Sequence, residues 1–310
     1  VDAALDWMQG VGDQPFGLWV HLFDPHGPYL PPPPWDTAYY EGDPRDPAHD
    51  SMEQVSEVAT YLERSLQGIT DLAWVQAQYA GEVSYADEQL GRLLNGLESL
   101  GHDNDTLVVV AGDHGESLGE HGVWFDHGDD LSEAATRVPL LFQWPGHLEA
   151  GAVVDHPVEL TDVAPTISSL LGLSVPTDSD GISLVRWMIP DGPESGPVRP
   201  FSRAICFDRQ ANLTAREQGT IERPTYRMVA LRDTVGRLVS RESEDSADRY
   251  YIVDEQGREH EAAPPGNTAQ DMAAMARNLL SGMTDQALER STTELDPTTR
   301  ARLEALGYVE

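Results

Sequence analysis

The sequence contains no lysine. Its 20 basic side chains are all arginine, they face 53 acidic ones over 310 residues, and the formal net charge is −33. A field of this sign repels phosphate backbones, so we expect no nucleic-acid partner. The net charge does not argue against a small anionic ligand, because such a site needs only local positive charge.

The sequence also has a single cysteine, no long apolar run and no signal-peptide pattern in its first residues. Cys206 is the only cysteine, so no intrachain disulfide can form and cysteine usage does not indicate a compartment. No apolar run approaches the roughly 20 residues that a membrane-spanning helix needs. The chain begins at Val1, without methionine, and Asp2 and Asp6 stand where a signal peptide would be basic. Because 3–9 already has a helical pattern, we expect an N-terminally truncated sequence.

The middle of the sequence alternates helical and strand patterns. Hydrophobic residues recur at steps of three and four over 72–100, which predicts a long amphipathic helix that ends at Gly101. A β-branched apolar run follows at 106–111, and this succession indicates an α/β domain whose sheet is covered on both faces. Three further elements are expected: buried strands at 16–22 and 137–144, and a helix at 158–171.

Proline and glycine mark the segments between these elements. The prolines at 31–34 exclude helix and central strand, and the acidic, poorly periodic stretch at 36–69 is interpreted as a lid or insertion. A proline and glycine cluster at 190–200 is expected to separate a larger α/β domain, 1–195, from a small one, 196–310. The small domain has the pattern of an antiparallel sheet with helices: strands in FSRAICF, TYRMVAL, GRLVSR and DRYYIV, and helices at 268–281 and 297–306.

Three loops that follow buried strands carry side chains able to do chemistry. In open α/β sheets, ligands gather where strands end, so these loops are the candidate site. Their side chains are His21 and His26, then Asp113 and His114, then His121 and His127.

The pair Asp113 and His114 offers a divalent cation a carboxylate oxygen and an imidazole nitrogen. Oxygen ligands suit calcium or magnesium, whereas an imidazole favours manganese or zinc. His26 could donate a hydrogen bond to an anion, and His127 could act as a general acid or a charge clamp.

Plainer interpretations stand beside these. An isolated D-H-G is as consistent with a turn, and each histidine alone is consistent with a loop or surface position. Glu116 and Glu120 are interpreted as a solvated face, because they are four residues apart. Trp124 and Phe125 are interpreted as packing residues rather than substrate platforms.

Several motifs, in their shared order, resemble those of sulfatases of the alkaline-phosphatase superfamily. Together they cover most of 1–190. They are H-L-F-D-P-H-G-P-Y-L-P-P at 21–32, Y-A-G-E-V-S-Y-A-D at 79–87, V-V-V-A-G-D-H-G-E-S-L-G-E-H-G at 108–122, R-V-P-L-L-F-Q-W-P-G at 137–146 and D-V-A-P-T-I-S-S-L-L-G-L at 162–173.

The resemblance implies a fold, an activity and a role for each candidate residue. The fold would be an alkaline-phosphatase-like α/β sheet flanked by helices, with a small C-terminal antiparallel-sheet plus helix subdomain. The activity would be hydrolysis of sulfate monoesters, small or polymeric. Asp113 and His114 would be ligands of one divalent metal ion, Ca²⁺ first and Mn²⁺ or Zn²⁺ after it. His26 would bind a sulfate oxygen, and His127, where many relatives have lysine, would contact sulfate and assist the leaving group. His21 is a weaker substrate-binding candidate.

The family's nucleophile is a formylglycine made from Cys or Ser in the motif C/S-x-P-x-R. We expect this chain to lack the motif, because the family places it ahead of the segment with which this chain begins. Cys206 is followed by Phe-Asp-Arg and lacks the proline. The chain alone is therefore expected to be inactive, and family analogy suggests a periplasmic or extracellular location.

Two other classes of function remain open. Phosphonate monoester hydrolases and phosphodiesterases share the superfamily, and phosphoethanolamine transferases carry a similar D-H-G-E-S-L-G-E run but lack the R-V-P-L-L strand. A non-catalytic homologue that binds a sulfated polysaccharide or a protein is the third hypothesis.

Overall fold

The chain divides into two compact units. The computed structural model describes residues 1–56, 58–128, 131–175, 179–189, 199–207, 227–241, 247–254, 258–263 and 265–282. The first unit consists of Val1–His127, Ala134–Val154 and Leu160–Pro197, and the second of Gly128–Glu133, Asp155–Glu159 and Val198–Glu310. The domain boundary expected between 195 and 196 stays a prediction.

The helices that belong to the first unit include one much longer than the rest. The α-helices are α1 (Asp2–Val11), α2 (Thr60–Leu66), α3 (Leu72–Ser99), α4 (Glu133–Thr136, which begins at the unit boundary), α5 (Val163–Leu170) and α6 (Val185–Met188). The 3-10 helices are η1 (Ser51–Gln54), η2 (Glu120–Gly122) and η3 (Leu160–Asp162). No described helix is both long enough and apolar enough to cross a bilayer.

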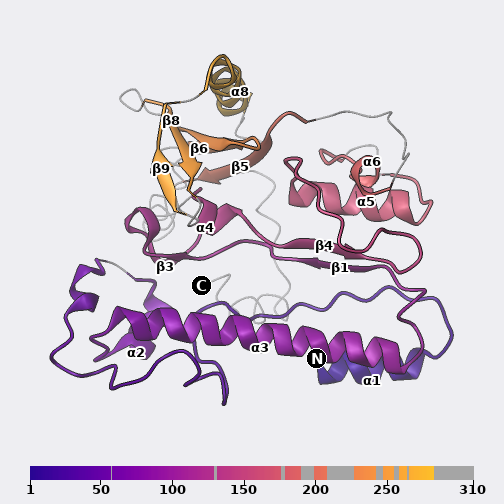
Figure 1. The fold of residues 1–310 in the computed structure, drawn as a ribbon, viewed down its shortest axis with the longest axis horizontal. Helices are drawn as coiled ribbons and strands as arrows, with labels where there is room; N and C mark the ends of the chain where they lie inside the picture. The colour runs from indigo at the N-terminus through magenta and orange to yellow at the C-terminus, as the bar shows by residue number, and fades with distance from the viewer. Residues whose placement is uncertain are drawn as a thin grey trace, which may run out of the picture. The chain divides into compact units, whose positions relative to one another are not determined.

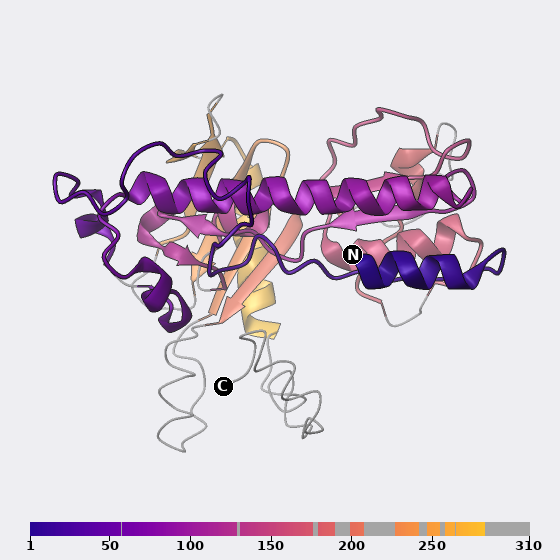
Figure 2. The same cartoon turned by 90° about the horizontal axis from the view of Figure 1, so that it is seen from below.

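Helix α3 confirms the predicted amphipathic helix. Asp71 caps its first turn by accepting a hydrogen bond from the Ala73 N–H at 3.1 Å. After its end, Gly101 adopts φ 80°, which suits a residue without a side chain. Helix α1 packs alongside α3 (Figure 1, Figure 2), where Arg92 Nη2 lies 2.5 Å from Asp2 Oδ1.

Two strand pairs lie in the first unit. Strand β1 (Val108–Ala111) pairs antiparallel with β4 (Leu140–Gln143), within the predicted apolar runs. Figure 1 shows this pair between α3 and the helices α5 and α6. None of the residues of β1 and β4 is buried, however, and Leu141 is 57% exposed, so the expected burial of these strands on both faces is not met. Strands β2 (Ser117–Leu118) and β3 (Trp124–Asp126) form the second pair.

The strand predicted at 16–22 is wrong. That run has no strand assignment, and the Trp19 side chain is 91% exposed. An apolar run becomes a buried strand only when a neighbouring strand pairs with it, and among the described residues none does. The side chains of this run favour a β-strand, but the run itself does not show whether another strand pairs with it.

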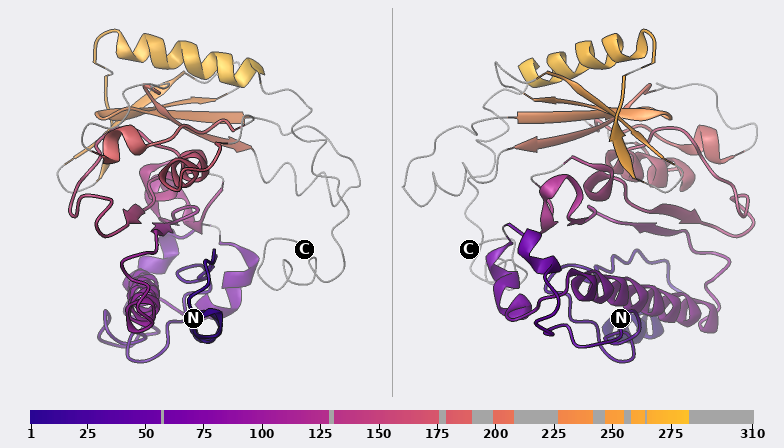
Figure 3. Two further views of the ribbon diagram at one scale, coloured as in Figure 1. Left: turned by 90° about the vertical axis from the view of Figure 1, so that its right-hand side faces the viewer. Right: turned by 60° about the vertical axis from the view of Figure 1, so that its left-hand side comes forward.

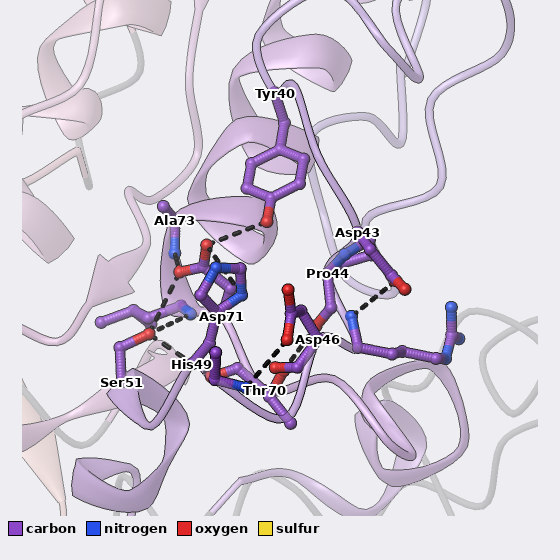
Figure 4. A network of polar contacts seen from close by, with 12 residues as sticks. Tyr40, Asp43, Pro44, Asp46, His49, Ser51, Thr70, Asp71 and Ala73 are labelled. Carbon is purple, nitrogen blue, oxygen red and sulfur yellow. Dashed lines mark hydrogen bonds and ion pairs between the residues drawn. The ribbon is translucent and has the colours of Figure 1, made fainter.

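The segment 36–69 is folded against the N-terminus of α3, and its helix α2 was not predicted. Asp71 accepts hydrogen bonds from two residues of this segment (Figure 4). Tyr40 Oη donates to Asp71 Oδ2 at 2.9 Å, and Ser51 Oγ donates to Oδ1 at 3.1 Å. These hydrogen bonds, the one from Tyr40 above all, lower the pKa of the Asp71 carboxyl. The segment also contributes to an apolar cluster of five buried side chains: Tyr29, Leu62, Ile69, Val75 and Phe125.

The second unit contains a five-stranded antiparallel sheet in chain order. Its strands are β5 (Ser202–Phe207), β6 (Arg227–Arg232), β7 (Gly236–Arg241), β8 (Arg249–Val253) and β9 (Glu259–Glu261). Helix α8 (Thr268–Gly282) lies across one face (Figure 3), with Met272 and Ala276 buried against Val229 and Leu231. The predicted antiparallel sheet plus helix is confirmed, β9 was missed, and the helix expected at 297–306 lies outside the described residues.

Candidate active site

Three of the predicted site histidines come together in the first unit. The His114 and His127 rings stack with centroids 3.8 Å apart and planes 17° apart. The His26 ring is edge-on to both, at 5.1 Å from His127 and 6.3 Å from His114. Each histidine comes from a different loop, so the fold unites positions that the sequence keeps far apart.

The orientation of His114 suits a metal ligand. Its Nδ1 lies 2.8 Å from the Gly115 carbonyl oxygen, which can only accept, so Nδ1 carries the proton and Nε2 the lone pair. A backbone acceptor that fixes the tautomer in this way is usual behind metal-binding imidazoles. The Asp113 carboxylate is positioned by the His114 N–H, which donates to its Oδ1 at 3.0 Å.

The donor set of Asp113 and His114 fits a single divalent ion but does not complete its coordination. Asp113 Oδ1 and His114 Nε2 are 3.8 Å apart. An ion about 2.0–2.5 Å from each ligand can bridge such a separation. In the part of the chain that the structure describes, no group of three or more His, Cys, Asp or Glu side chains forms a metal site. The pair therefore supplies a part of a coordination shell.

His26 is half-buried between aromatic rings. Phe23 lies at 4.7 Å, and Tyr61 of α2 stacks at 5.6 Å with planes 27° apart. Its Nδ1 donates to the Gly27 carbonyl oxygen at 2.7 Å. Burial lowers the pKa of His26, and the nearby imidazoles of His127 and His114 lower it further, against the opposing effect of the Gly27 hydrogen bond. The neutral ring is thereby favoured, with a lone pair on Nε2.

Glu116 belongs to this cluster, although its spacing from Glu120 indicated a solvated face. Its side chain is only 4% exposed, and its Oε1 lies 3.4 Å from His127 Nδ1. The spacing argument assumed a helix, whereas this stretch is a loop that enters β2, so the two glutamates do not share a face. Glu120 is exposed, and its Oε2 accepts from the Leu118 N–H. The sequence signal that could have identified Glu116 as a site residue is its position directly after the D-H-G turn.

Aromatic packing supports the loops from behind. Phe125 is fully buried and lies edge-on to the Tyr29 ring at 6.1 Å, so its predicted packing role is confirmed. Tyr29 is 3% exposed and also lies edge-on to Tyr79 of α3 at 5.5 Å. Burial raises the pKa of the Tyr29 hydroxyl, and the Glu116 carboxylate adds to this effect. Tyr29 therefore stays a neutral phenol near the Glu116 carboxylate.

The structure does not bring His21 into the histidine cluster. His21 is exposed and lines a separate cavity of about 200 Å³ together with Asp2, Asp24 and Arg92. Among the described rings, no aromatic contact joins His21 to the other three histidines. Its role in substrate binding stays a prediction.

The expectation that the letters C/S-x-P-x-R are absent is wrong in one place. Ser195-Gly196-Pro197-Val198-Arg199 satisfies the five-residue pattern. It follows the D-H-G motif, whereas the family places the nucleophile ahead of that motif. Of these residues, 199 alone is described, and the buried Arg199 lies with its Nε 3.3 Å from Glu159 Oε1. Sequence order thus argues against Ser195 as the modified residue.

Comparisons with known proteins agree on one family. The family model described as Sulfatase matches residues 1–173. The chain is 34% identical over 199 residues to the N-acetylglucosamine-6-O-sulfatase of Bacteroides thetaiotaomicron, which covers 63% of this chain and 33% of that protein. It is 30% identical to an arylsulfatase of Clostridium perfringens, over 55% of this chain and 37% of the relative.

Solved structures agree on the fold. The phosphonate monoester hydrolase from Silicibacter pomeroyi superposes with a TM-score of 0.68 at 25% identity, over 90% of this chain and 58% of that one. The predicted alkaline-phosphatase-like α/β fold is confirmed by such neighbours. The chain spans about a third of the length of these two sulfatase relatives. On the match of its first 173 residues to the family model, the chain belongs to the sulfatase family.

Proposed function

We propose that this chain provides the substrate-anion and leaving-group side of an active site that hydrolyses sulfate monoesters. The convergence of His26, His114 and His127 from three loops carries the proposal. Sequence relatives that are named as sulfatases support the same ester class.

Each side chain has a distinct task in this proposal. Asp113 and His114 hold one divalent ion, with calcium as the first choice and manganese or zinc after it. When bound, such an ion polarises the oxygens of the sulfate group. His26, once protonated, donates from Nε2 to a sulfate oxygen. His127 delivers a proton to the departing alcohol oxygen, and the Glu116 carboxylate, 3.4 Å from its Nδ1, orients the ring for this transfer.

Sulfate binding tests the role of His26. We expect His26→Ala to weaken the binding of inorganic sulfate at pH 5 by roughly tenfold. The lower pH offsets the lowered pKa of His26 by protonating more of the rings, and a charge-assisted hydrogen bond contributes about 1.5–3 kcal/mol. Calorimetry in a sulfate-free and phosphate-free buffer measures the change. His147→Ala is the matched control, because that exposed ring stacks on Trp144, and not on any ring of the cluster. Equal affinity in the wild type and in His26→Ala would contradict the assignment.

The nucleophile is proposed to be a formylglycine supplied by sequence outside these 310 residues. We therefore expect the isolated chain to show no turnover of an aryl sulfate and Ser195 to remain an unmodified serine. Peptide mass spectrometry detects the loss of hydrogen that converts a serine hydroxymethyl group into an aldehyde. An aldehyde at 195 together with turnover that is abolished in Ser195→Ala would refute this prediction.

A second candidate function keeps the same residues and changes the ester to a phosphonate monoester. The structural likeness to a phosphonate monoester hydrolase favours this ester over phosphoethanolamine transfer and over a non-catalytic binding role. Comparing turnover of an aryl sulfate with that of an aryl phosphonate monoester, in a protein that contains the nucleophile, separates the two ester classes. A preference for the phosphonate ester would replace our first choice.

A further inference from the structure

Residues 27–31, which follow His26, pack against the helices α2 and α3. Gly27 is buried so tightly against α2 that a Cβ there would approach Leu62 Cδ2 to 2.8 Å. Two residues later, the Tyr29 ring is buried as a member of the apolar cluster. Beyond it, Pro31 packs against α3, where a Cβ on Gly81 would lie 2.8 Å from Pro31 Cγ.

A buried acid on α3 holds the backbone of the same segment. Glu82 is only 3% exposed, and its Oε1 accepts a hydrogen bond of 2.7 Å from the Leu30 N–H. Its Oε2 is buried and has no hydrogen-bond partner among the described residues. Burial raises the pKa of Glu82 to about 8, Asp24 adds to this effect, and the Leu30 N–H opposes it.

Two adjacent residues of α3 at this contact, Gly81 and Glu82, are unfavourable where they stand in a buried part of the helix. A glycine inside a helix is less favourable than an alanine, and a buried carboxyl with one partner is also unfavourable. Gly81 leaves room for the Trp35 carbonyl oxygen, 2.6 Å from where a Cβ would be, and Glu82 provides an acceptor. Departures of this kind are expected at functional sites.

We propose that Glu82 is a positioning residue: its carboxyl holds the Leu30 amide and thereby fixes the segment that carries His26. The Leu30 amide is four residues from His26. The backbone between them has little freedom, because Gly27 is packed against Leu62 and Tyr61 of α2 and the Tyr29 ring is buried in the apolar cluster. The proposal depends on the proposed function only for the role of His26 as the sulfate ligand.

Hydrogen exchange at the Leu30 amide tests the contact directly. We expect Glu82→Met, which keeps the bulk and removes the acceptor, to speed this exchange roughly tenfold, because the amide loses its partner. Glu82→Gln keeps a carbonyl acceptor and should leave the rate within a few-fold of the wild type. Glu82→Asp withdraws the carboxyl by one methylene and should behave like Glu82→Met. Amide exchange is followed by NMR at pH 6.5.

The imidazole signals of His26 report whether the effect reaches the site. They should shift in Glu82→Met and Glu82→Asp and return to the wild-type position in Glu82→Gln. Glu98→Gln is the matched control, because that glutamate is exposed on the same helix. Unchanged Leu30 exchange or unchanged His26 signals in the folded Glu82→Asp protein would overturn the proposal. Absence of a sulfate-induced shift at His26 in the wild type would instead overturn the proposed function alone.

Discussion

Gly115→Ala is expected to destabilise the protein by about 3 kcal/mol, the upper end of the usual cost of forcing an extra atom into a packed site. A Cβ at this position would collide with the Ala134 carbonyl oxygen of α4 and lie 2.9 Å from its carbon. The collision also separates the Gly115 N–H from the Ala135 carbonyl oxygen, to which it donates at 2.8 Å. Urea unfolding followed by tryptophan fluorescence measures the loss.

The same substitution should weaken metal binding about 10–100-fold, because the Gly115 carbonyl orients the His114 ring. Gly91→Ala is the control: nothing lies within 4 Å of the added Cβ, and alanine is the better helix former, so stability should be unchanged or slightly higher. If Gly115→Ala unfolds at the wild-type urea concentration and binds manganese equally well, the packing described for this turn is incorrect.

Glu82→Gln is expected to raise the stability of the protein at alkaline pH. The pKa of Glu82 is about 8 in the folded chain, against an ordinary value of 4.5. A raised pKa means that the stability this carboxyl contributes is fully present below about pH 4.5 and is lost as the pH rises to about 8. Above pH 8 the folded state bears the full cost of burying the charge, which is on the order of a few kcal/mol.

Glutamine does not titrate, so the variant should match the wild type near pH 4.5 and exceed it by a few kcal/mol at pH 9. Urea unfolding at both pH values gives the difference, and titration of other groups cancels in the comparison. The exposed Glu98→Gln variant should show no such dependence. A constant difference between Glu82→Gln and the wild type across this pH range would mean that Glu82 ionises normally in the folded state.

Elements whose pattern is local could be predicted from the sequence. The predictions of α3 and of the strands β5 to β8 depend on the side-chain pattern within each element, and these predictions were correct. The run at 16–22 failed because burial of a strand depends on a partner that the run does not encode. Helix α2 was missed for a related reason: its stability comes from packing on the Tyr29 cluster, not from its own periodicity.

The candidate site divides in the same way. His26, His114 and His127 could be proposed from their places after apolar runs and from the family motifs. Glu116 and Glu82 could not be proposed from the sequence. Charged residues are mostly exposed, so burial of these two carboxyls was not expected. Glu82 contacts the Leu30 amide, 52 residues away in the sequence, and Glu116 contacts His127 across the β2–β3 pair. Neither contact follows from the residues next to the glutamate, so both roles required the structure.

The order of strands in the second unit has a consequence for how it forms. Among the strands that the structure describes, every neighbour in the β5–β9 sheet is also the next strand along the chain. Such a meander has low contact order. Each strand can therefore pair with the preceding one, and this pairing does not depend on a segment far away in the sequence. During synthesis the sheet can therefore grow in the direction of translation, and α8, which follows the last strand, closes its apolar face at the end.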